Sequence, residues 1–436
     1  MSSSLDLLKE STKKASELVS RHEFIRVYTH YDADGISAGA IVAKALLRAK
    51  KNFQISFLKT LNDDFEYEKG TLLIFADMGS AYPEKMSKVE SDLIILDHHI
   101  PVGNINPKRN LVHINPHIFG LDGTYELSAS GVAYFFAKAL GDNNDLSSTA
   151  IVGILGDKQK FKGPNEVVLK EGKEGGYVEE KEGINLASGK IKKVLSLSLE
   201  PYLNFYKKDG ELEEFLKKIK IDGEKDFEDL SFEELQRLSD AIALRLLKLG
   251  TYEGVFESIF GRRIVLKNAP IKSAALLTDV VNSCGRAGAT GVAMGLLMGD
   301  RSYLDRALSI YEDYLTKVHE ELLKRKNDVK EGFCMRYIVM EDAPTTSLIA
   351  TTYSRYIFTE KPLIVINRKN DRVKVSARAN EKIAQKLNLA EVMRLAAEKV
   401  GGVGGGHKVA AGANIPSNKI EEFLKEVDRI CCTALA

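Results

Sequence analysis

Four short apolar runs in the first third of this chain constrain its fold most, because each run ends in an acidic residue or a histidine. The polar residues that follow the runs are, in chain order, His30, Asp32 and Asp34; Asp77; Asp97, His98 and His99; and Asp157. A single acidic residue in such a position is often only a helix cap. Four such ends favour one shared metal site, because ligands of open parallel sheets bind beyond the carboxyl ends of the strands.

The alternation of these runs with helical stretches predicts the fold class. We expect strands near 24–30, 53–59, 71–76, 92–96 and 111–115, and helices over 5–20, 37–50 and 130–140. Nearly continuous apolar strands in such an alternation indicate an α/β fold whose parallel sheet is covered on both faces. From about residue 331 a second alternation predicts a smaller C-terminal α/β domain. Its strands are expected near 334–340, 362–367 and 372–377, and its helices near 345–356, 388–399 and 418–430.

The composition changes between these two α/β parts. Residues 162–189 are rich in Lys, Glu and Gly and predict a loop or an irregular strand pair, whereas residues 211–250 predict charged amphipathic helices. We interpret this mainly helical insertion as a solvated module, with partner docking as the alternative. The predicted parts are a metal-site domain, an inserted domain, a helical segment with a charged connector, and the C-terminal domain, with bounds 1–162, 163–271, 272–330 and 331–436.

Composition and cysteine spacing exclude several classes of protein. A hydrophobic content of 44%, a charged content of 28% and a net charge of +1 are typical of a soluble globular chain without a global basic field. No stretch approaches the roughly 18 apolar residues of a membrane span, and the N-terminus has no signal-peptide core. Cys284, Cys334, Cys431 and Cys432 show no paired spacing, so we expect a cytoplasmic protein without disulfides.

The residue types at the ends of the apolar runs predict the chemistry. Mixed carboxylate and imidazole ligands suit manganese, and magnesium or zinc less clearly. Asp32 and Asp34 would point to one side of an extended segment, with Gly35 turning the backbone into a helix from Ile36. The candidate ligands are His30, Asp32, Asp34, Asp77, His98 and Asp157. Six ligands exceed the needs of one ion, so the central Asp77 is expected to bridge two ions about 3.5–4 Å apart. Such a pair activates water and neutralises phosphoryl charge, which predicts hydrolysis of a phosphate ester or anhydride.

Three other segments are candidate anion sites. The run Gly404-Gly405-Gly406-His407 could let backbone N–H groups approach an anion, although such a run is also typical of a flexible loop. Arg378 follows a predicted strand and could offer a guanidinium fork to a phosphate. Arg286 ends an apolar helical stretch, where a lone arginine is usually a surface residue; the alternative is a substrate contact.

Taken together, these motifs resemble a known family. His30-x-Asp32-x-Asp34-Gly35, Asp77, Asp97-His98-His99 and Asp157 resemble, in order, the four motifs of the DHH phosphoesterase superfamily. The segment Gly404 to His407 with Ala410-Ala411-Gly412 resembles the motif of the DHH-associated C-terminal domain. Asn115-Pro116, Ser130-Gly131-Val132 and Asn282-x-x-Gly285-Arg286 are similar to segments of RecJ-type exonucleases. The middle insertion is similar to that of archaeal RecJ-like proteins, including the GINS-associated nuclease.

The resemblance implies roles for individual residues. Asp97, His98 and His99 would form the catalytic motif, with His99 in contact with the scissile phosphate. The implied ligands of one manganese ion are Asp32 and Asp77, with His30 as a further candidate. At the position of His30 the chain departs from bacterial RecJ, which has an acid there. The implied ligands of the other ion are Asp34, Asp77, His98 and Asp157. The implied substrate contacts are Arg286 to the nucleic-acid backbone, and Arg378, Gly404, Gly405, Gly406 and His407 to the nucleotide beyond the cleavage point.

The implied function is a manganese-dependent exonuclease, with magnesium as a second candidate ion. It would release mononucleotides from single-stranded DNA or RNA during replication or repair, with GINS and the replisome as partners. One alternative is a phosphodiesterase of short oligonucleotides (nanoRNase) or cyclic dinucleotides. The other alternative is a non-catalytic replisome scaffold that binds GINS. Because a scaffold has no need of six metal ligands, the sequence favours the enzyme.

Overall fold

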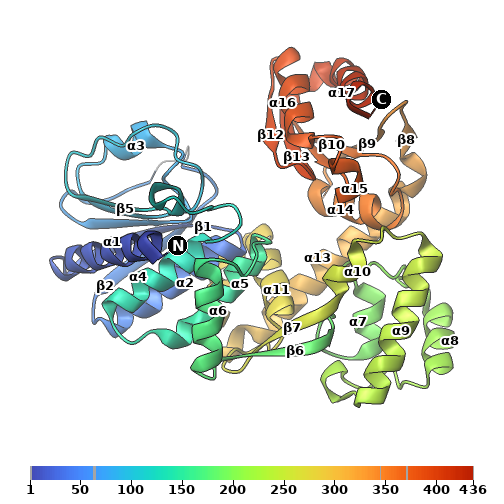
Figure 1. The fold of residues 1–436 in the computed structure, drawn as a ribbon, viewed down its shortest axis with the longest axis horizontal. Coiled ribbons are helices and arrows are strands. Elements are labelled where there is room, and N and C mark those ends of the chain that lie inside the picture. The colour runs from blue at the N-terminus through green and yellow to red at the C-terminus, as the bar shows by residue number, and fades with distance from the viewer. Residues whose placement is uncertain (1, 62–64, 344, 370–371, 436) are drawn as a thin grey trace. The chain divides into compact units, whose positions relative to one another are not determined.

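The computed structural model describes residues 2–61, 65–343, 345–369 and 372–435 of the chain. It divides into two compact units, each built from two separate stretches (Figure 1). The first unit contains Met1–Lys181 and Arg263–Tyr311, and the second contains Glu182–Arg262 and Glu312–Ala436. The predicted insertion, residues 163–271, and the predicted helical segment, residues 272–330, are each shared between the two units.

The first unit is organised around a parallel sheet of five strands in the order β2-β1-β3-β4-β5. The strands are β1 (Phe24–His30), β2 (Asn52–Leu58), β3 (Leu72–Ala76), β4 (Asp92–Leu96) and β5 (Leu111–Ile114). All five occur where the apolar runs predict strands, so the predicted α/β class is confirmed. Every residue of β3 is buried, as expected for a central strand covered on both faces.

Helices cover one face of this sheet and a shorter helix with loops covers the other (Figure 1). The helices on the first face are α1 (Ser2–Ser20), α2 (Ala33–Arg48) and α4 (Ala129–Leu140), followed outward by α5 (Ser147–Gly156) and α6 (Pro164–Glu174). On the other face, Tyr28 and Phe75 pack with Met86 of α3 (Pro83–Ser87) and with Leu61. The sheet therefore has a core on both sides, as the alternation predicts.

Two helices from much later in the chain complete the first unit. They are α11 (Ala274–Arg286) and α12 (Thr290–Met298), and both pack against α2. The side chain of Ser273 caps α11 by accepting a hydrogen bond from the Leu276 amide. α11 also packs against α5, so it contacts two of the helices that carry the candidate site.

The second unit contains a six-stranded mixed sheet in the order β12-β13-β11-β10-β9-β8. Its strands are β8 (Lys330–Glu331), β9 (Arg336–Glu341), β10 (Leu363–Lys369), β11 (Arg372–Arg378), β12 (Val403–Gly406) and β13 (Ala410–Pro416). Its helices are α14 (Thr346–Tyr356), α15 (Glu381–Ala384), α16 (Leu389–Lys399) and α17 (Ile420–Leu435). This confirms the small C-terminal α/β domain, except that the glycine run forms strand β12 instead of a loop.

The remaining segments are mainly helical, as predicted for the insertion. They comprise β6 (Val178–Ile184) paired with β7 (Phe260–Leu266), and α7 (Ile191–Leu197), α8 (Asp209–Ile219), α9 (Phe232–Leu249), α10 (Val255–Ile259) and α13 (Leu304–Arg325). The short 3-10 segments are η1 (Pro116–Phe119), η2 (Asn144–Leu146), η3 (Phe227–Asp229), η4 (Arg301–Tyr303), η5 (Lys326–Asp328) and η6 (Ser417–Lys419). Residues 162–189 were expected to lack a helix, which is wrong: Pro164 at the first turn starts α6.

The cysteines contradict the expectation that none of them pairs. Cys334 and Cys432 form a disulfide across 98 residues of sequence, between the segment before β9 and the end of α17. Cys284 and Cys431 are free and buried. Spacing patterns detect local cysteine pairs and metal motifs, so they missed a pair that the fold brings together. The cysteines thus give no support to a cytoplasmic location. No described helix is long and apolar enough to cross a membrane.

Candidate metal centre

Strand register places the first predicted ligands side by side. Ala76 at the end of β3 is opposite Thr29 of β1 and Leu96 of β4. The next residues along these strands are His30, Asp77 and Asp97, so all three lie at the carboxyl edge of the sheet. After β1 the chain adds β2 on one side and β3 on the other, which makes this edge the topological switch point of the sheet.

Asp77 lies at the middle of this edge in an unusual backbone conformation. Its φ is 60°, in the left-handed region that aspartate adopts more readily than most residues. Its amide donates to the Leu96 carbonyl at 2.8 Å, which continues the β3–β4 ladder by one residue. The turn leaves the carboxylate only 3% exposed, between His30 and His98.

Asp32 and Asp34 lie at the start of α2, which begins at Ala33 and not at Ile36 as expected. Asp32 is the N-cap, and its Oδ1 accepts from the Gly35 amide at 3.0 Å. The two carboxylates do not lie in one extended segment, because the helix begins between them, at Ala33. Asp32 Oδ2 is 3.0 Å from His30 Nδ1.

Asp34 points in another direction, toward the start of α4. Its two oxygens accept from the amides of Ala129 at 2.7 Å and Ser130 at 3.0 Å, and the residue is fully buried. These N–H groups belong to the first turn of a helix, where they have no partner within the helix and favour a negative charge. Of the predicted segment Ser130-Gly131-Val132, it is Ser130 that helps to fix Asp34, together with the preceding Ala129.

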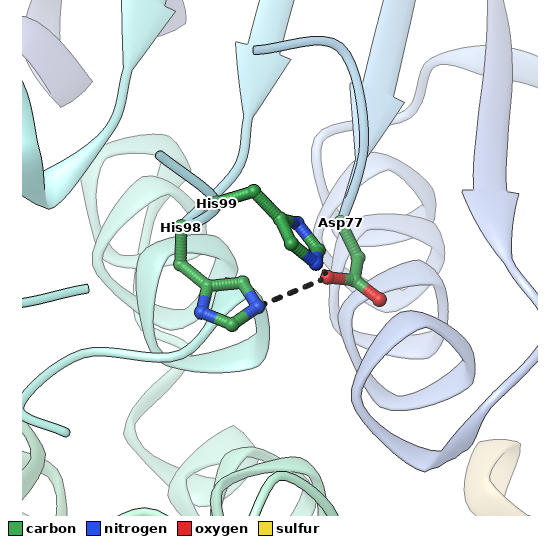
Figure 2. Close-up of side chains that lie close together, drawn as sticks. All are labelled: Asp77, His98 and His99. Atoms are coloured by element: carbon green, nitrogen blue, oxygen red, sulfur yellow. Dashed lines mark ion pairs between the residues drawn. The ribbon is translucent and has the colours of Figure 1, made fainter. Parts of the chain in front are cut away.

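The predicted ligands, together with His99, form three overlapping groups. Within each group the candidate donor atoms lie within 4.8 Å of one another. The groups are His30, Asp32 and Asp77; Asp34, His98 and Asp157; and Asp77, His98 and His99. Asp77 connects the first group to His98, which belongs to the other two groups, because Oδ2 is 3.4 Å from His30 Nδ1 and Oδ1 is 3.4 Å from His98 Nε2. Figure 2 shows His98 and His99 directed at the Asp77 carboxylate.

Asp157 reaches the site from a helix and not from a strand. The apolar run over residues 151–155 belongs to α5, and Asp157 is the residue that caps the C-terminus of that helix. One Asp157 oxygen lies 3.0 Å from His98 Nε2. Asp157 thus lies beside other predicted ligands, although the element that carries it is a helix and not a strand.

A set of residues that sequence reasoning missed orients His98. Its Nδ1 is 2.8 Å from the Gly123 carbonyl; because a carbonyl only accepts, Nδ1 carries the proton and Nε2 faces the carboxylates. Gln159 donates to the same carbonyl at 2.8 Å, and Asn165 donates to the Gln159 side chain at 2.8 Å. A Cβ on Gly123 would lie 2.2 Å from the His98 carbonyl oxygen, so this approach requires glycine. These residues have no motif of their own, and only the folded chain reveals them.

Asp97 organises the loop after β4 and is not a member of the three metal-ligand groups. Its Oδ1 accepts from His99 Nδ1 and from the His98 amide, both at 2.8 Å, and its Oδ2 accepts from the Ser80 amide at 2.8 Å. The Asn115 side chain donates at 2.8 Å to the Ser80 hydroxyl and to the His99 carbonyl. Asp97 therefore positions His98 and His99.

Burial and mutual charge shift the pKa values of the site in opposite directions. Burial raises the pKa of Asp34 to about 6, with a further contribution from the charge of Asp77, and burial also raises the pKa of Asp77. Burial opposes protonation of His30 and His99, but their aspartate partners outweigh it and raise the pKa values to about 11 and about 9. The field of these carboxylates therefore favours any added positive charge.

The side chains present fit a divalent metal. Asp77 Oδ1 is buried and makes no hydrogen bond to any described residue, although His98 Nε2 is 3.4 Å away. The three groups contain four carboxylates and three imidazoles with no thiolate, a donor set suited to manganese or magnesium more than to a soft metal. Since the like charges repel, a cation between them would relieve a cost that the protein otherwise bears.

The candidate substrate residues of the second unit gather at one end of its sheet. Arg378 ends β11 and donates to the Thr351 hydroxyl at 3.1 Å and to the Ala377 carbonyl at 2.8 Å. No ion pair joins it to a carboxylate of the described chain, so its charge is unmatched. Gly404, Gly405 and Gly406 in β12 pair with β13, which also pairs with β11, and His407 follows them. Arg286 is exposed at the end of α11 in the first unit.

Comparisons with known proteins agree with this geometry. Residues 24–155 match the DHH family, N-terminal domain, and residues 337–432 match the DHHA1 domain. An uncharacterized protein of Methanocaldococcus jannaschii is 34% identical over 451 residues, covering 99% of this chain and 98% of that protein. The single-stranded-DNA-specific exonuclease RecJ of Bacillus subtilis is 29% identical over 187 residues, covering 38% of this chain and 23% of that protein.

Solved structures show the same fold at low sequence identity. RecJ of Thermus thermophilus in complex with Mn2+ has a TM-score of 0.61 at 16% identity, covering 98% of this chain and 55% of that chain. CDC45 of Entamoeba histolytica has a TM-score of 0.61 at 12% identity, covering 98% of both chains.

The fold and the clustered candidate ligands define the class of protein: it has a phosphoesterase fold, with a candidate metal centre at the topological switch point of its parallel sheet. The chain belongs to the DHH superfamily and is a RecJ-like member of it, with a DHH domain followed by a DHHA1 domain.

Proposed function

We propose that this protein is a two-metal nuclease that hydrolyses phosphodiester bonds of single-stranded DNA, RNA or both, releasing mononucleotides. The observation that carries the proposal is the position of Asp77, whose two oxygens face His30 and His98 at 3.4 Å each. One carboxylate shared by two ligand groups is the arrangement that holds two ions at bridging distance. The imidazole and carboxylate donors favour manganese, with magnesium as the second candidate.

The proposed ligand sets follow the two groups on either side of Asp77. His30, Asp32 and Asp77 would hold one ion. Asp34, His98 and Asp157 would hold the other together with Asp77, whose Oδ1 is 3.4 Å from His98 Nε2. When bound, such a pair of ions supplies an activated water and neutralises the charge that develops on the phosphoryl group. Asp97 holds the catalytic loop by accepting four hydrogen bonds from it and from Ser80.

His99 is proposed to contact the scissile phosphate. Its side chain is 54% exposed, and its Nδ1 is fixed by Asp97 Oδ1 at 2.8 Å. Burial opposes its protonation, but Asp97 raises its pKa to about 9, so the ring is cationic at neutral pH. A cation held at this edge would bind a phosphate oxygen and stabilise charge in the transition state.

The second unit is proposed to bind the nucleotide beyond the cleavage point. Arg378 has a guanidinium without a carboxylate partner in the described chain, which suits a phosphate. The strand Gly404-Gly405-Gly406 with His407 offers a backbone that an anion can approach. Arg286, exposed at the end of α11, is proposed to contact the nucleic-acid backbone.

The test uses the purified protein with Mn2+ or Mg2+ and end-labelled single strands of DNA and RNA, labelled at either end. We expect mononucleotides from long strands, with the label giving the direction of degradation. Degradation of only very short oligonucleotides or cyclic dinucleotides would replace the exonuclease by the corresponding phosphodiesterase.

A scaffold is the second candidate, because the fold of the whole chain is similar to that of CDC45. Binding to purified GINS, expected from the family resemblance, is tested by size-exclusion chromatography of the mixed proteins. Tight GINS binding without hydrolysis under any metal would make the scaffold the leading function, whereas hydrolysis together with binding would place the nuclease in replication.

A further inference from the structure

We infer that Asn282 and Gly285 of α11 are positioning residues that hold the Asp32 ligand of one metal ion. The inference rests on the proposed function, because it assigns these residues to one of the two proposed ligand sets. Both lie about 250 residues after Asp32 in the sequence, yet they belong to the same compact unit. Their role is thus distinct from that of Arg286, which ends the same helix and is exposed.

Asn282 supplies a cap that α2 cannot provide for itself. The first amides of a helix have no partner within it. In α2, Asp32 accepts from the amides of Gly35 and Ile36, and the amide of Ala33 donates to Asn282 Oδ1 at 3.0 Å. Ala33 is only 1% exposed, so water does not replace this acceptor. Asn282 therefore fixes the peptide that joins Asp32 to α2.

Gly285 fixes the other side of Asp32. A Cβ built on Gly285 would lie 1.9 Å from the backbone oxygen of Tyr31. Backbone cannot move aside as a flexible side chain can, so any larger residue must displace the segment that joins His30 to Asp32. The glycine allows α11 to lie directly against this segment, and Asn282, one turn earlier, then reaches the Ala33 amide.

The second ion set has supports of its own. Asp34 is held by the amides of Ala129 and Ser130, and His98 is oriented by the Gly123 carbonyl. None of these contacts involves α11. Loss of the Asn282 cap should therefore weaken the ion held by His30, Asp32 and Asp77, and leave the ion held by Asp34, His98 and Asp157 in place. This selectivity separates positioning from a general effect on folding.

The experiment measures Mn2+ binding to full-length wild type, Asn282→Leu and Asn282→Asp by titration calorimetry, with the melting temperature of each metal-free protein. Leucine has a similar volume but no acceptor, whereas aspartate keeps the acceptor. For Asn282→Leu we expect the affinity for one of two ions to fall about 10–100-fold, the usual scale for residues that orient ligands, and the other to change less than about threefold. Asn282→Asp should bind both ions as the wild type does, because it keeps the acceptor.

Gly285→Ala tests the close approach, with Gly291→Ala in α12 as the matched control because a Cβ there meets nothing within 4 Å. Gly285→Ala should weaken binding of the ion held by His30, Asp32 and Asp77, as Asn282→Leu does. Gly291→Ala should bind both ions with wild-type affinity. Wild-type affinity for both ions in Asn282→Leu, or equal loss of both, would overturn the inference. A wild type that binds no Mn2+ would overturn the proposed function as well.

Discussion

At the scale of single residues, Asp77 is the group on which both proposed ions depend. Asp77→Ala should abolish binding of both ions and lower hydrolysis by about 1000-fold or more, equivalent to about 4 kcal/mol of transition-state stabilisation. The exposed Asp142→Ala in the same unit serves as the control and should retain activity. Hydrolysis rates at saturating Mn2+ and circular dichroism of both variants check this. Near-normal hydrolysis by a folded Asp77→Ala protein would remove the bridging role.

Protonation of the histidines gives a second prediction at this scale. Burial opposes protonation of His30 and His98, but neighbouring aspartates raise both pKa values, that of His30 to about 11. Both rings are thus doubly protonated and cationic at neutral pH in the metal-free protein. An imidazole that binds a metal must be neutral, so it has to lose one of these protons. Mn2+ binding should therefore release protons, and affinity should rise with pH, about tenfold per unit for each proton released.

Calorimetry in two buffers of different ionisation enthalpy counts the released protons directly. His30→Gln removes one titrating ring and should lower the proton count by about one. Identical heats in the two buffers would contradict the prediction, since they would mean that the ligands are already deprotonated in the metal-free protein.

At the scale of elements, the sequence predicts the strands of the first unit well and the surroundings of the site poorly. Runs such as Leu72–Ala76 are buried on both faces, so their composition alone identifies them. A short buried run in a helix has the same composition, which is why residues 151–155 of α5 were not distinguished from the strand runs. Asn282 and Gln159 act through contacts between distant segments, and no local pattern encodes such contacts.

The glycines of β12 give a prediction at this scale, because neighbouring positions differ in the space around them. A Cβ on Gly404 would lie 2.2 Å from the Met393 carbonyl of α16, whereas a Cβ on Gly405 meets nothing within 4 Å. Gly404→Ala should therefore destabilise the second unit. Gly405→Ala should keep the melting temperature but weaken binding of a single-stranded oligonucleotide, because a methyl group would stand where the backbone approaches the phosphate.

Fluorescence anisotropy with a labelled oligonucleotide, beside thermal unfolding, separates the two effects. Normal affinity in a stable Gly405→Ala protein would remove this strand from the proposed substrate site. The comparison needs both variants, since a loss of affinity in Gly404→Ala alone would reflect damage to the packing of α16 on β12.

At the scale of the whole molecule, each compact unit is closed by chain that returns from far away in the sequence. α11 and α12 return to the first unit, and α17 returns to β8 and β9 in the second. The predicted domain bounds follow one another along the sequence, whereas each compact unit combines two separate stretches of chain. In the second unit the amides of Phe333 and Cys334 also donate to Asp428 of α17, so this closure uses hydrogen bonds as well as the disulfide.

The disulfide between Cys334 and Cys432 gives a prediction at this scale, because it closes a loop of 98 residues. Closing a loop of this length restricts the unfolded chain and should stabilise the second unit by about 2–4 kcal/mol. Cys432→Ser should lower the unfolding transition of that unit in the absence of reductant. Reductant should lower the unfolding transition of the wild-type unit by as much as Cys432→Ser does, and should leave the transition of the variant unchanged. Thiol titration of the denatured, unreduced wild type should detect Cys284 and Cys431 alone; four reactive thiols would contradict the pairing.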